Sequence, residues 1–447
     1  MVKKLVGVLV AAALLVGASY GVHALTRPRP NTPVQTSANA AAGAAGDSVA
    51  DGAEAGRLIR AYEAVAHSHH DEGVDLMLAS LYLQRGRFTG DLGTYRQALG
   101  AATDAARLAP RDPATTTLLA SSRFSLHDWA GARRAAMRAL ALDPHRQNAA
   151  VVLADADLET GRYADAASLY AKLGNAVAGS ASLVVRQARL AWVTGDLSRA
   201  RGLAAQALRL APDNGASGAN LAFYSVFASQ LAIDAGDYRA AVIAGKRAVH
   251  VAPTWHVAIA ARAKALAVAG RTAEAIRDYR RAAAIVPLPD YLGALGDLLW
   301  LSGRHAAARQ QYATVDAITR IASTQRDVYN RQLVLFGADH DRHVELAVRM
   351  SRAELTVRRD AAGYDALAWA LHAAGRDDEA RSYSDRALGV SPVDPRFEWH
   401  AAAISAALGQ RARAVELLTG LLQRSPYFDP LQGTRAAALL ATLRDAR

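Results

Sequence analysis

Two short stretches of the chain gather histidines beside acidic residues, and these side-chain types bind divalent metal ions. Imidazole and carboxylate groups suit first-row divalent ions, but neither stretch has the ligand spacing of a zinc finger or of an HExxH helix. We therefore assign no metal site and keep a metal-handling accessory protein as an alternative function. The candidate ligands are His67, His69 and His70 in the first stretch, and His340 and His343 in the second.

The chain carries no motif of an established catalytic type. It contains no nucleophile elbow, Walker loop, dinucleotide-binding fingerprint or kinase signature, and its acidic residues are scattered. It also contains no cysteine, which excludes a cysteine nucleophile, a thiolate metal site and a disulfide within this sequence. These observations predict a non-enzymatic protein with no catalytic residue and no cofactor. An envelope enzyme remains the less favoured alternative.

Alanine, glycine and proline recur along the chain at one period, and this period indicates the elements that must position any site. The alanines are separated by steps of 34, 34, 34, 41, 34, 33, 39, 33 and 34 residues, and the glycines and prolines keep the same spacing. Self-similarity at such a period is the signature of a repeat architecture. The alanines are Ala98, Ala132, Ala166, Ala200, Ala241, Ala275, Ala308, Ala347, Ala380 and Ala414, and the glycines are Gly161, Gly195, Gly236, Gly270, Gly303, Gly375 and Gly409.

The residues 363–392 show what one repeat contains. Leu367 and Leu371 lie on one face of a first helix, and Gly375 ends that helix in the left-handed conformation that glycine adopts without strain. Ala380 lies on the inner face of a second helix, which Pro392 ends. Each repeat is therefore expected to be a helical hairpin that buries its apolar face by stacking on its neighbours.

This pattern resembles the tetratricopeptide repeat, a helix-turn-helix unit of 34 residues. The resemblance implies an all-α fold, a right-handed superhelix of about ten hairpins over residues 49–447. We expect capping helices at both ends of this α-solenoid. The N-terminal cap is predicted over residues 49–66, with Leu58, Ile59, Tyr62 and Val65 on one face, and the C-terminal cap over residues 431–443.

In tetratricopeptide repeats the first helices line a concave face, and the resemblance assigns particular repeat positions to it. Four of the six tryptophans occupy such positions, so we predict that this face binds a peptide or protein partner. Packing of the same rings between neighbouring helices is the alternative. The predicted binding residues are Arg189, Trp192, Asp297, Trp300, Phe336, Asp365, Trp369, His372 and Trp399, and Asp155, Lys264, Asp339 and His340 share the positions.

The first 24 residues have the layout of a secretory signal. Two lysines precede an apolar run, and small residues follow at positions suited to cleavage. An uncleaved anchor is the alternative, because residues 5–22 carry no charge and are nearly long enough to cross a bilayer. Residues 25–48 are rich in Pro, Ala, Ser and Gly, which is typical of a flexible linker. Either reading predicts an extracytoplasmic protein, secreted or tethered to the membrane.

The chain is basic, with a net charge of +11 and a pI near 10.0. Such a charge is compatible with binding to nucleic acid, but the arginines are dispersed at spacings typical of solvated helix faces. No zinc finger or RNA-recognition motif accompanies them, so we predict no nucleic-acid partner.

Several longer strings are similar to a family of exported bacterial tetratricopeptide proteins that has no assigned activity. Among them are LYLQRGRFTGDLGTYRQAL, ELTVRRDAAGYDALAWAL and SPYFDPLQGTRAAALLATL. The resemblance supports the compartment and the repeat number, and it carries no catalytic residue to this chain. The function predicted from the sequence is therefore a non-enzymatic extracytoplasmic scaffold.

Overall fold

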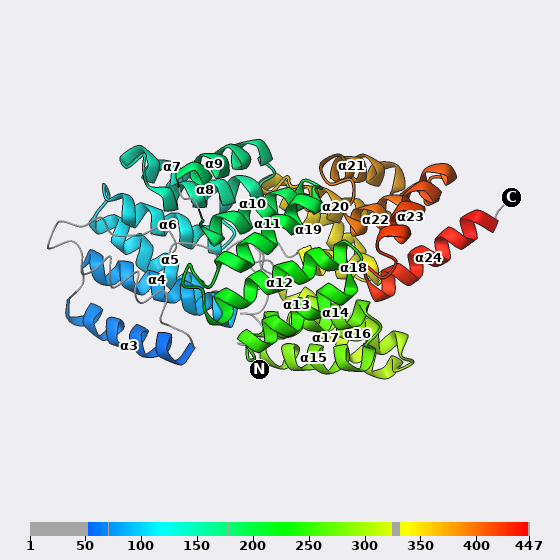
Figure 1. The fold of residues 1–447 in the computed structure, drawn as a ribbon, viewed down its shortest axis with the longest axis horizontal. Coiled ribbons are helices and arrows are strands. Elements are labelled where there is room, and N and C mark those ends of the chain that lie inside the picture. Colours follow the sequence, from blue (N-terminus) through cyan, green and yellow to red (C-terminus); the bar gives the residue numbers. More distant parts are fainter. Residues whose placement is uncertain (1–51, 70, 177–178, 324–330, 446–447) are drawn as a thin grey trace. The chain divides into compact units, whose positions relative to one another are not determined.

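The chain folds entirely into helices where the structure describes it. The computed structural model describes residues 52–69, 71–176, 179–323 and 331–445. Within these ranges there are 22 helices, α3 to α24, and no strand (Figure 1). The predicted all-α class is confirmed. The predicted signal or anchor over residues 1–24 and the linker over residues 25–48 lie outside the described residues.

The described part of the chain forms two compact units. The N unit comprises residues 52–187 and 206–221, and the C unit comprises residues 188–205 and 222–445. The helices α10 (Ala181–Val193), α11 (Leu197–Leu210) and α12 (Gly218–Asp234) contribute residues to both units.

The N unit begins with a single helix, α3 (Gly52–Ser68), and continues with three helical hairpins. Each hairpin pairs a first and a second helix that lie side by side (Figure 1). The hairpins are α4 (Glu72–Thr89) with α5 (Leu92–Leu108), α6 (Pro113–Ser125) with α7 (Trp129–Leu142), and α8 (Gln147–Glu159) with α9 (Tyr163–Ala176).

The C unit contains six complete hairpins and ends with the single helix α24 (Pro430–Asp445). Its hairpins are α12 with α13 (Tyr238–Val251), α14 (His256–Val268) with α15 (Thr272–Ile285), α16 (Pro289–Leu301) with α17 (His305–Ser323), α18 (Arg331–Asp339) with α19 (Val344–Val357), α20 (Ala361–Ala373) with α21 (Asp377–Val390), and α22 (Pro395–Ala407) with α23 (Arg411–Arg424). Together with α10 and α11, the described residues form ten hairpins, as the resemblance implied.

The repeat residues occupy the places that their spacing predicts. Nine of the ten repeat alanines have no exposed surface, and Ala347 is 3% exposed. The seven turn glycines have φ between +70° and +84°, the left-handed region that closes a first helix. Small residues at the contact and glycines at the turn therefore set the hairpin geometry.

Single helices stand at both ends of the described hairpins, as predicted. In α3, Ile59 is 2% exposed, and Leu58 and Tyr62 pack against the core of α4 and α5. Val65, predicted on the same face, is 44% exposed. In α24, Ala436 and Leu440 are buried against the last hairpins.

Candidate functional site

Aspartates from distant parts of the C unit lie near the same charged groups. Desolvation by the surrounding protein raises the pKa of Asp234 in α12 and of Asp290 in α16, and the charge of Lys264 in α14 opposes both shifts. The same charge opposes the rise in the pKa of Asp429, which precedes α24. We call this set the acidic face. Its members are Asp234, Lys264, Asp290, Asp297, Asp339, Asp394, Arg396 and Asp429.

Asp234 ends α12, where neutral donors hold its half-buried carboxylate. The Trp192 Nε1–H donates to it at 2.8 Å and the Gln230 side-chain amide at 2.7 Å. Lys264 Nζ donates to the Gln230 oxygen at 3.0 Å rather than to the carboxylate. Burial, together with the nearby charge of Asp394, raises the pKa of Asp234 to about 6.

Asp290 is the second residue of α16, and its carboxylate has no hydrogen bond or ion pair to any described residue. The side chain is exposed, yet the surrounding protein raises its pKa to about 6 against the opposing charges of Lys264 and Arg396. The charges of Lys264 and Arg396 act on Asp290, which places this residue near the other carboxylates of the acidic face.

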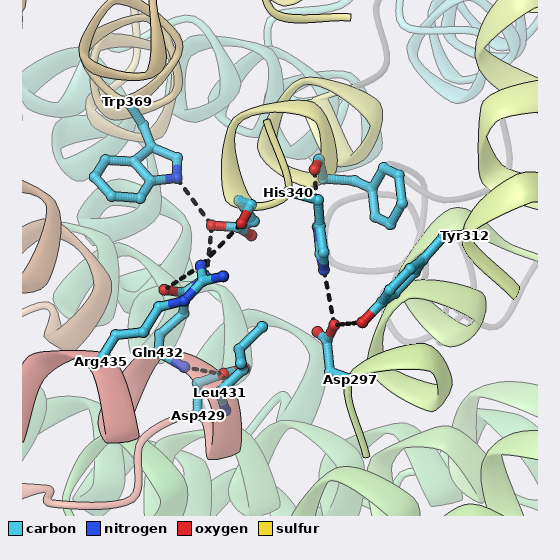
Figure 2. Close-up of polar contacts among 10 residues, drawn as sticks. Asp297, Tyr312, His340, Trp369, Asp429, Leu431, Gln432 and Arg435 are labelled. Carbon is cyan, nitrogen blue, oxygen red and sulfur yellow. Dashed lines mark hydrogen bonds and ion pairs between the residues drawn. The ribbon is translucent and has the colours of Figure 1, made fainter. Parts of the chain in front are cut away.

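Asp297 lies seven residues, almost two helical turns, further along α16 and binds two side chains (Figure 2). Tyr312 Oη donates to Asp297 Oδ1 at 2.7 Å, and His340 Nε2 donates to the same oxygen at 2.7 Å. His340 Nδ1 also lies 2.9 Å from the Phe336 carbonyl, so both ring nitrogens donate. Burial by itself lowers the pKa of His340, but the hydrogen bond to Asp297 and the nearby carboxylates raise it overall. His340 is therefore a protonated partner of Asp297.

Asp339 ends α18 and is the centre of a hydrogen-bond relay (Figure 2). Its Oδ1 accepts from Trp369 Nε1 at 2.9 Å and from the Gln432 side-chain amide at 2.7 Å. The Gln432 oxygen in turn accepts from Trp399 Nε1 at 3.1 Å. Arg435 donates to the backbone carbonyl of Asp339 at 2.8 Å. The C-terminal helix thus joins α18 and α20 through the Asp339 carboxylate and α22 through the Gln432 side chain.

Asp429 begins the C-terminal helix. Its Oδ1 accepts from the backbone N–H groups of Leu431 and Gln432, each at 2.9 Å, which satisfies two of the unpaired donors of the helix terminus. Burial raises the pKa of Asp429 to about 6, and the charge of Asp297 adds to the shift. This carboxylate faces the others rather than solvent outside the C unit.

The acidic face has more negative than positive charge. Near its six aspartates lie the cationic groups of Lys264, Arg396 and Arg435 and the imidazoles of His340 and His400, and most of the hydrogen-bond donors to the aspartates are indole, phenol and amide groups. A neutral donor orients a carboxylate without cancelling its charge. The arrangement is therefore suited to binding a cationic group.

The structure brings several of the predicted binding residues together around this face. Phe336, Trp369 and Trp399 are 6%, 5% and 5% exposed, and the Trp369 and Trp399 ring centroids lie 6.0 Å apart. His340 links Asp297 to these rings, because it donates to Asp297 and its ring stacks on Phe336 with the ring centroids 4.4 Å apart. Contact of these rings with a partner stays a prediction.

Other predicted binding residues lie around this cluster or apart from it. Asp365 is 2% exposed and accepts from His400 Nδ1 at 2.8 Å, while His372 lies 2.5 Å from Asp377 and stacks on Trp369. Trp300 is 43% exposed and packs on His305. Trp192 bonds Asp234 as described above, and Arg189 is half-buried in α10.

The candidate metal ligands have other partners. His67 lies 2.6 Å from the Glu63 carbonyl, and Asp71 caps α4 by accepting from Val74 N–H. His69 and His343 each lie near one aspartate, and His340 binds Asp297. His70 lies outside the described residues. Across the described ranges, no group of three or more histidine and acidic side chains is arranged to hold a metal ion.

Sequence reasoning missed Asp234, Asp290, Asp394 and Asp429. These residues lie at helix ends, outside the repeat positions that the resemblance assigns to the concave face. Asp394 and Asp429 each precede a proline that begins a helix, and this pair of residues is a cap signature visible in the sequence. The cap signature locates the residues but does not show that they converge.

Comparison with protein families finds one match. The model described as "Tetratricopeptide repeat" matches residues 117–179 and 260–319. No curated protein matches the chain.

Several solved structures are similar to this chain. A chain of the APC/C hetero-tetramer Cut9–Hcn1 matches with 13% identity, a TM-score of 0.32, and coverage of 87% of this chain and 93% of that chain. Yeast Tom70 matches with 13% identity, a TM-score of 0.34, and coverage of 91% and 96%. A tetratricopeptide repeat protein from Parabacteroides merdae matches with 15% identity, a TM-score of 0.33, and coverage of 59% and 99%.

None of the described helices combines the length and the apolar character that a membrane span requires.

Proposed function

We propose that this chain, a tetratricopeptide-repeat protein, is a non-enzymatic extracytoplasmic scaffold that binds a basic segment of a partner protein on its acidic face. Stacked helical hairpins present extended concave surfaces for protein–protein interaction. The fold therefore supports the general role, and the acidic face supports the chemistry of the partner.

The observation that carries this proposal is the excess of carboxylates at the acidic face. Asp290 has no partner among the described residues, and Asp234 and Asp429 are held by uncharged donors while their pKa values are raised to about 6. A lysine or arginine of a partner would remove this unfavourable electrostatic energy. Because the protein itself already desolvates these carboxylates, part of the cost of burying an ion pair is met before the partner binds.

A pair of matched peptides tests the proposal. One peptide combines lysine with leucine, and the other has glutamate at every lysine position. We expect the purified chain without residues 1–48 to bind the lysine peptide at least about tenfold more tightly, and the preference to shrink as salt is added. Equal binding of both peptides would contradict the proposal.

Two variants with the same charge change then locate the binding. Asp290→Asn removes a carboxylate from the acidic face, whereas Asp378→Asn removes an exposed one at the start of the second helix α21. We expect only Asp290→Asn to weaken binding of the lysine peptide, by about threefold to tenfold. The same loss in both variants would indicate attraction by the net charge of the protein rather than by the acidic face.

The compartment is a separate part of the proposal and depends on the first 48 residues. Their lysines, apolar run and small residues support export, followed by cleavage or by retention of residues 5–22 as an anchor. Fusing residues 1–48 to alkaline phosphatase tests this, because that reporter needs an oxidising compartment to form its disulfides. We expect an active fusion. Inactive enzyme in the cytoplasm would contradict the proposed location.

A further inference from the structure

Turn glycines that share one conformation have different surroundings in the C unit. Gly236 and Gly270 follow consecutive first helices with φ of +71° and +74°. A Cβ atom added to Gly270 would meet nothing within 4 Å, and the same holds for Gly303, Gly375 and Gly409. A Cβ atom added to Gly236 would lie 2.0 Å from the backbone oxygen of Arg424. The turn at Gly236 is therefore covered by a segment almost two hundred residues further along the chain.

Hydrogen bonds hold this covering segment in place. Tyr427 N–H donates to Tyr238 Oη at 2.8 Å, and the same hydroxyl lies 3.1 Å from Ser425 Oγ. Ser425 Oγ also lies within hydrogen-bond distance, 3.1 Å, of the Ile233 carbonyl, and Ser425 has no exposed surface. A second covered turn lies next to it, because a Cβ atom added to Gly195 would lie 2.8 Å from Pro392 Cδ.

The same segment reaches the opposite wall of the C unit. After Asp429 caps α24, Gln432 and Arg435 bind Asp339 at the end of α18 (Figure 2). We call residues 424–435 the clasp. The clasp contacts the α12–α13 turn at one end and α18 at the other, so it closes the C unit into a ring around the acidic face.

We propose that the clasp releases the α12–α13 turn as a unit, and that this release opens the ring to admit the partner segment. A closed ring admits only a free chain end, whereas an open ring also admits a segment within a folded partner. The contacts with the α12–α13 turn are a few hydrogen bonds, one close turn-to-turn approach and one pair of neighbouring tyrosine rings, Tyr238 and Tyr427, whereas each hairpin is held by a buried apolar core. Opening at the clasp therefore requires less free energy than separating any hairpin. The admission step rests on the proposed function, but the release does not.

Amide hydrogen exchange of two glycine variants tests the release. Gly236→Ala and Gly270→Ala place the same side chain in the same left-handed turn, so their backbone strain is alike. We expect both to lower the melting temperature similarly, and only Gly236→Ala to raise exchange over residues 425–435, by about tenfold or more. Tyr238→Phe removes the shared hydroxyl without adding volume. It should raise the exchange rates of the same amides by a smaller factor. Equal exchange over the clasp in the two glycine variants would overturn the proposal.

A reversible bridge tests admission. The chain has no cysteine, so Tyr238→Cys with Tyr427→Cys creates the only thiol pair, at positions whose rings lie 6.1 Å apart. A short bis-methanethiosulfonate reagent can bridge the pair, and a reductant removes the bridge.

We expect the bridged protein to bind a lysine–leucine segment placed in a loop of a folded carrier at least about tenfold more slowly, with recovery on reduction. Unchanged association after bridging would refute gating by the clasp. Absence of binding in every form would instead refute the proposed function, and the exchange result would still decide whether the clasp opens.

Discussion

Two buried carboxylates of the N unit have different partners from the carboxylates of the acidic face. In the N unit, Asp155 accepts from Arg186 Nε at 2.9 Å, and both residues are almost fully buried. Asp157 accepts from two further arginines, Arg133 at 3.0 Å and Arg162 at 2.5 Å. In the C unit, the carboxylates of the acidic face accept mainly from indole, phenol and amide groups. Arginine neutralises a carboxylate within the fold, whereas neutral donors leave its charge available to a partner. The comparison therefore separates structural carboxylates from candidate binding ones.

The largest expected effect is the loss of a structural carboxylate. Asp155→Ala removes the carboxylate that neutralises the buried Arg186 guanidinium, and breaking a buried ion pair in this way costs about 3–5 kcal/mol. The matched change in the C unit, Asp290→Ala, removes an unpaired charge that the fold desolvates, so it should raise rather than lower the free energy of unfolding at pH 7. Urea unfolding followed by circular dichroism measures both. Similar losses in the two variants would remove the distinction between the units.

Overpacking of a hairpin contact should cost less and should be shared by both units. Ala132 in α7 and Ala275 in α15 have no exposed surface. Replacing either with leucine should lower the free energy of unfolding by about 1–3 kcal/mol, because the contact between the helices has no space for a larger side chain. Ala284→Leu on the exposed side of α15 is the control. Unchanged unfolding of Ala275→Leu would mean that the repeat alanines do not define the hairpin contact.

Trp300 should separate binding from stability. This ring is 43% exposed on α16, so Trp300→Ala should change the free energy of unfolding by less than about 0.5 kcal/mol. If Trp300 is an aromatic anchor for the partner, the same change should weaken binding of the lysine–leucine peptide by about 1–2 kcal/mol. Ile243→Ala, which truncates a 60% exposed side chain on the second helix α13, is the control. Full binding by Trp300→Ala would remove Trp300 from the predicted binding residues.

The smallest expected effect is a pH dependence of stability in the C unit. The folded-state pKa of Asp290 is about 6, above its ordinary value of 3.8, so the folded state binds more protons between these pH values. Stability should therefore fall as pH rises from about 4 to about 6 and stay level above. His256 acts in the opposite direction, because burial lowers its pKa to about 4 and stability is lost as pH falls below 6.5.

The difference between the wild-type chain and Asp290→Asn isolates this carboxylate, because His256, Asp234 and Asp429 titrate in both proteins. We expect the wild type to gain stability relative to the variant as pH falls from 6 to 4. Parallel pH curves would show that Asp290 is solvated like an ordinary surface carboxylate.

Local patterns in the sequence predicted the hairpins but not the closure of the C unit. Alanine, glycine and proline act within one repeat, so their spacing was enough to predict ten hairpins and their turns. Asp297, Phe336 and Trp369 were predicted to share one face because each occupies a first helix. The approach of Arg424 to Gly236 depends on small rotations accumulated over several repeats, and no local pattern records that sum.

The acidic face illustrates the same limit. Asp394 and Asp429 are recognisable as cap residues from the prolines that follow them. Their convergence with Asp234 and Asp290 follows from the curvature of the C unit, which brings helix ends from distant repeats to one space. Counting positions within a repeat cannot find such a site, because its members occupy no common repeat position.

Carbodiimide coupling tests most directly the claim that the acidic face binds a basic segment. This reagent joins a lysine amine to a carboxylate only where the two are in contact, and mass spectrometry then identifies the modified residue. The account predicts that the lysine–leucine peptide couples mainly to Asp290, Asp234, Asp394 and Asp429, and that excess uncoupled peptide suppresses these products. Coupling spread over exposed carboxylates such as Asp378 and Asp213, with none at the acidic face, would contradict it.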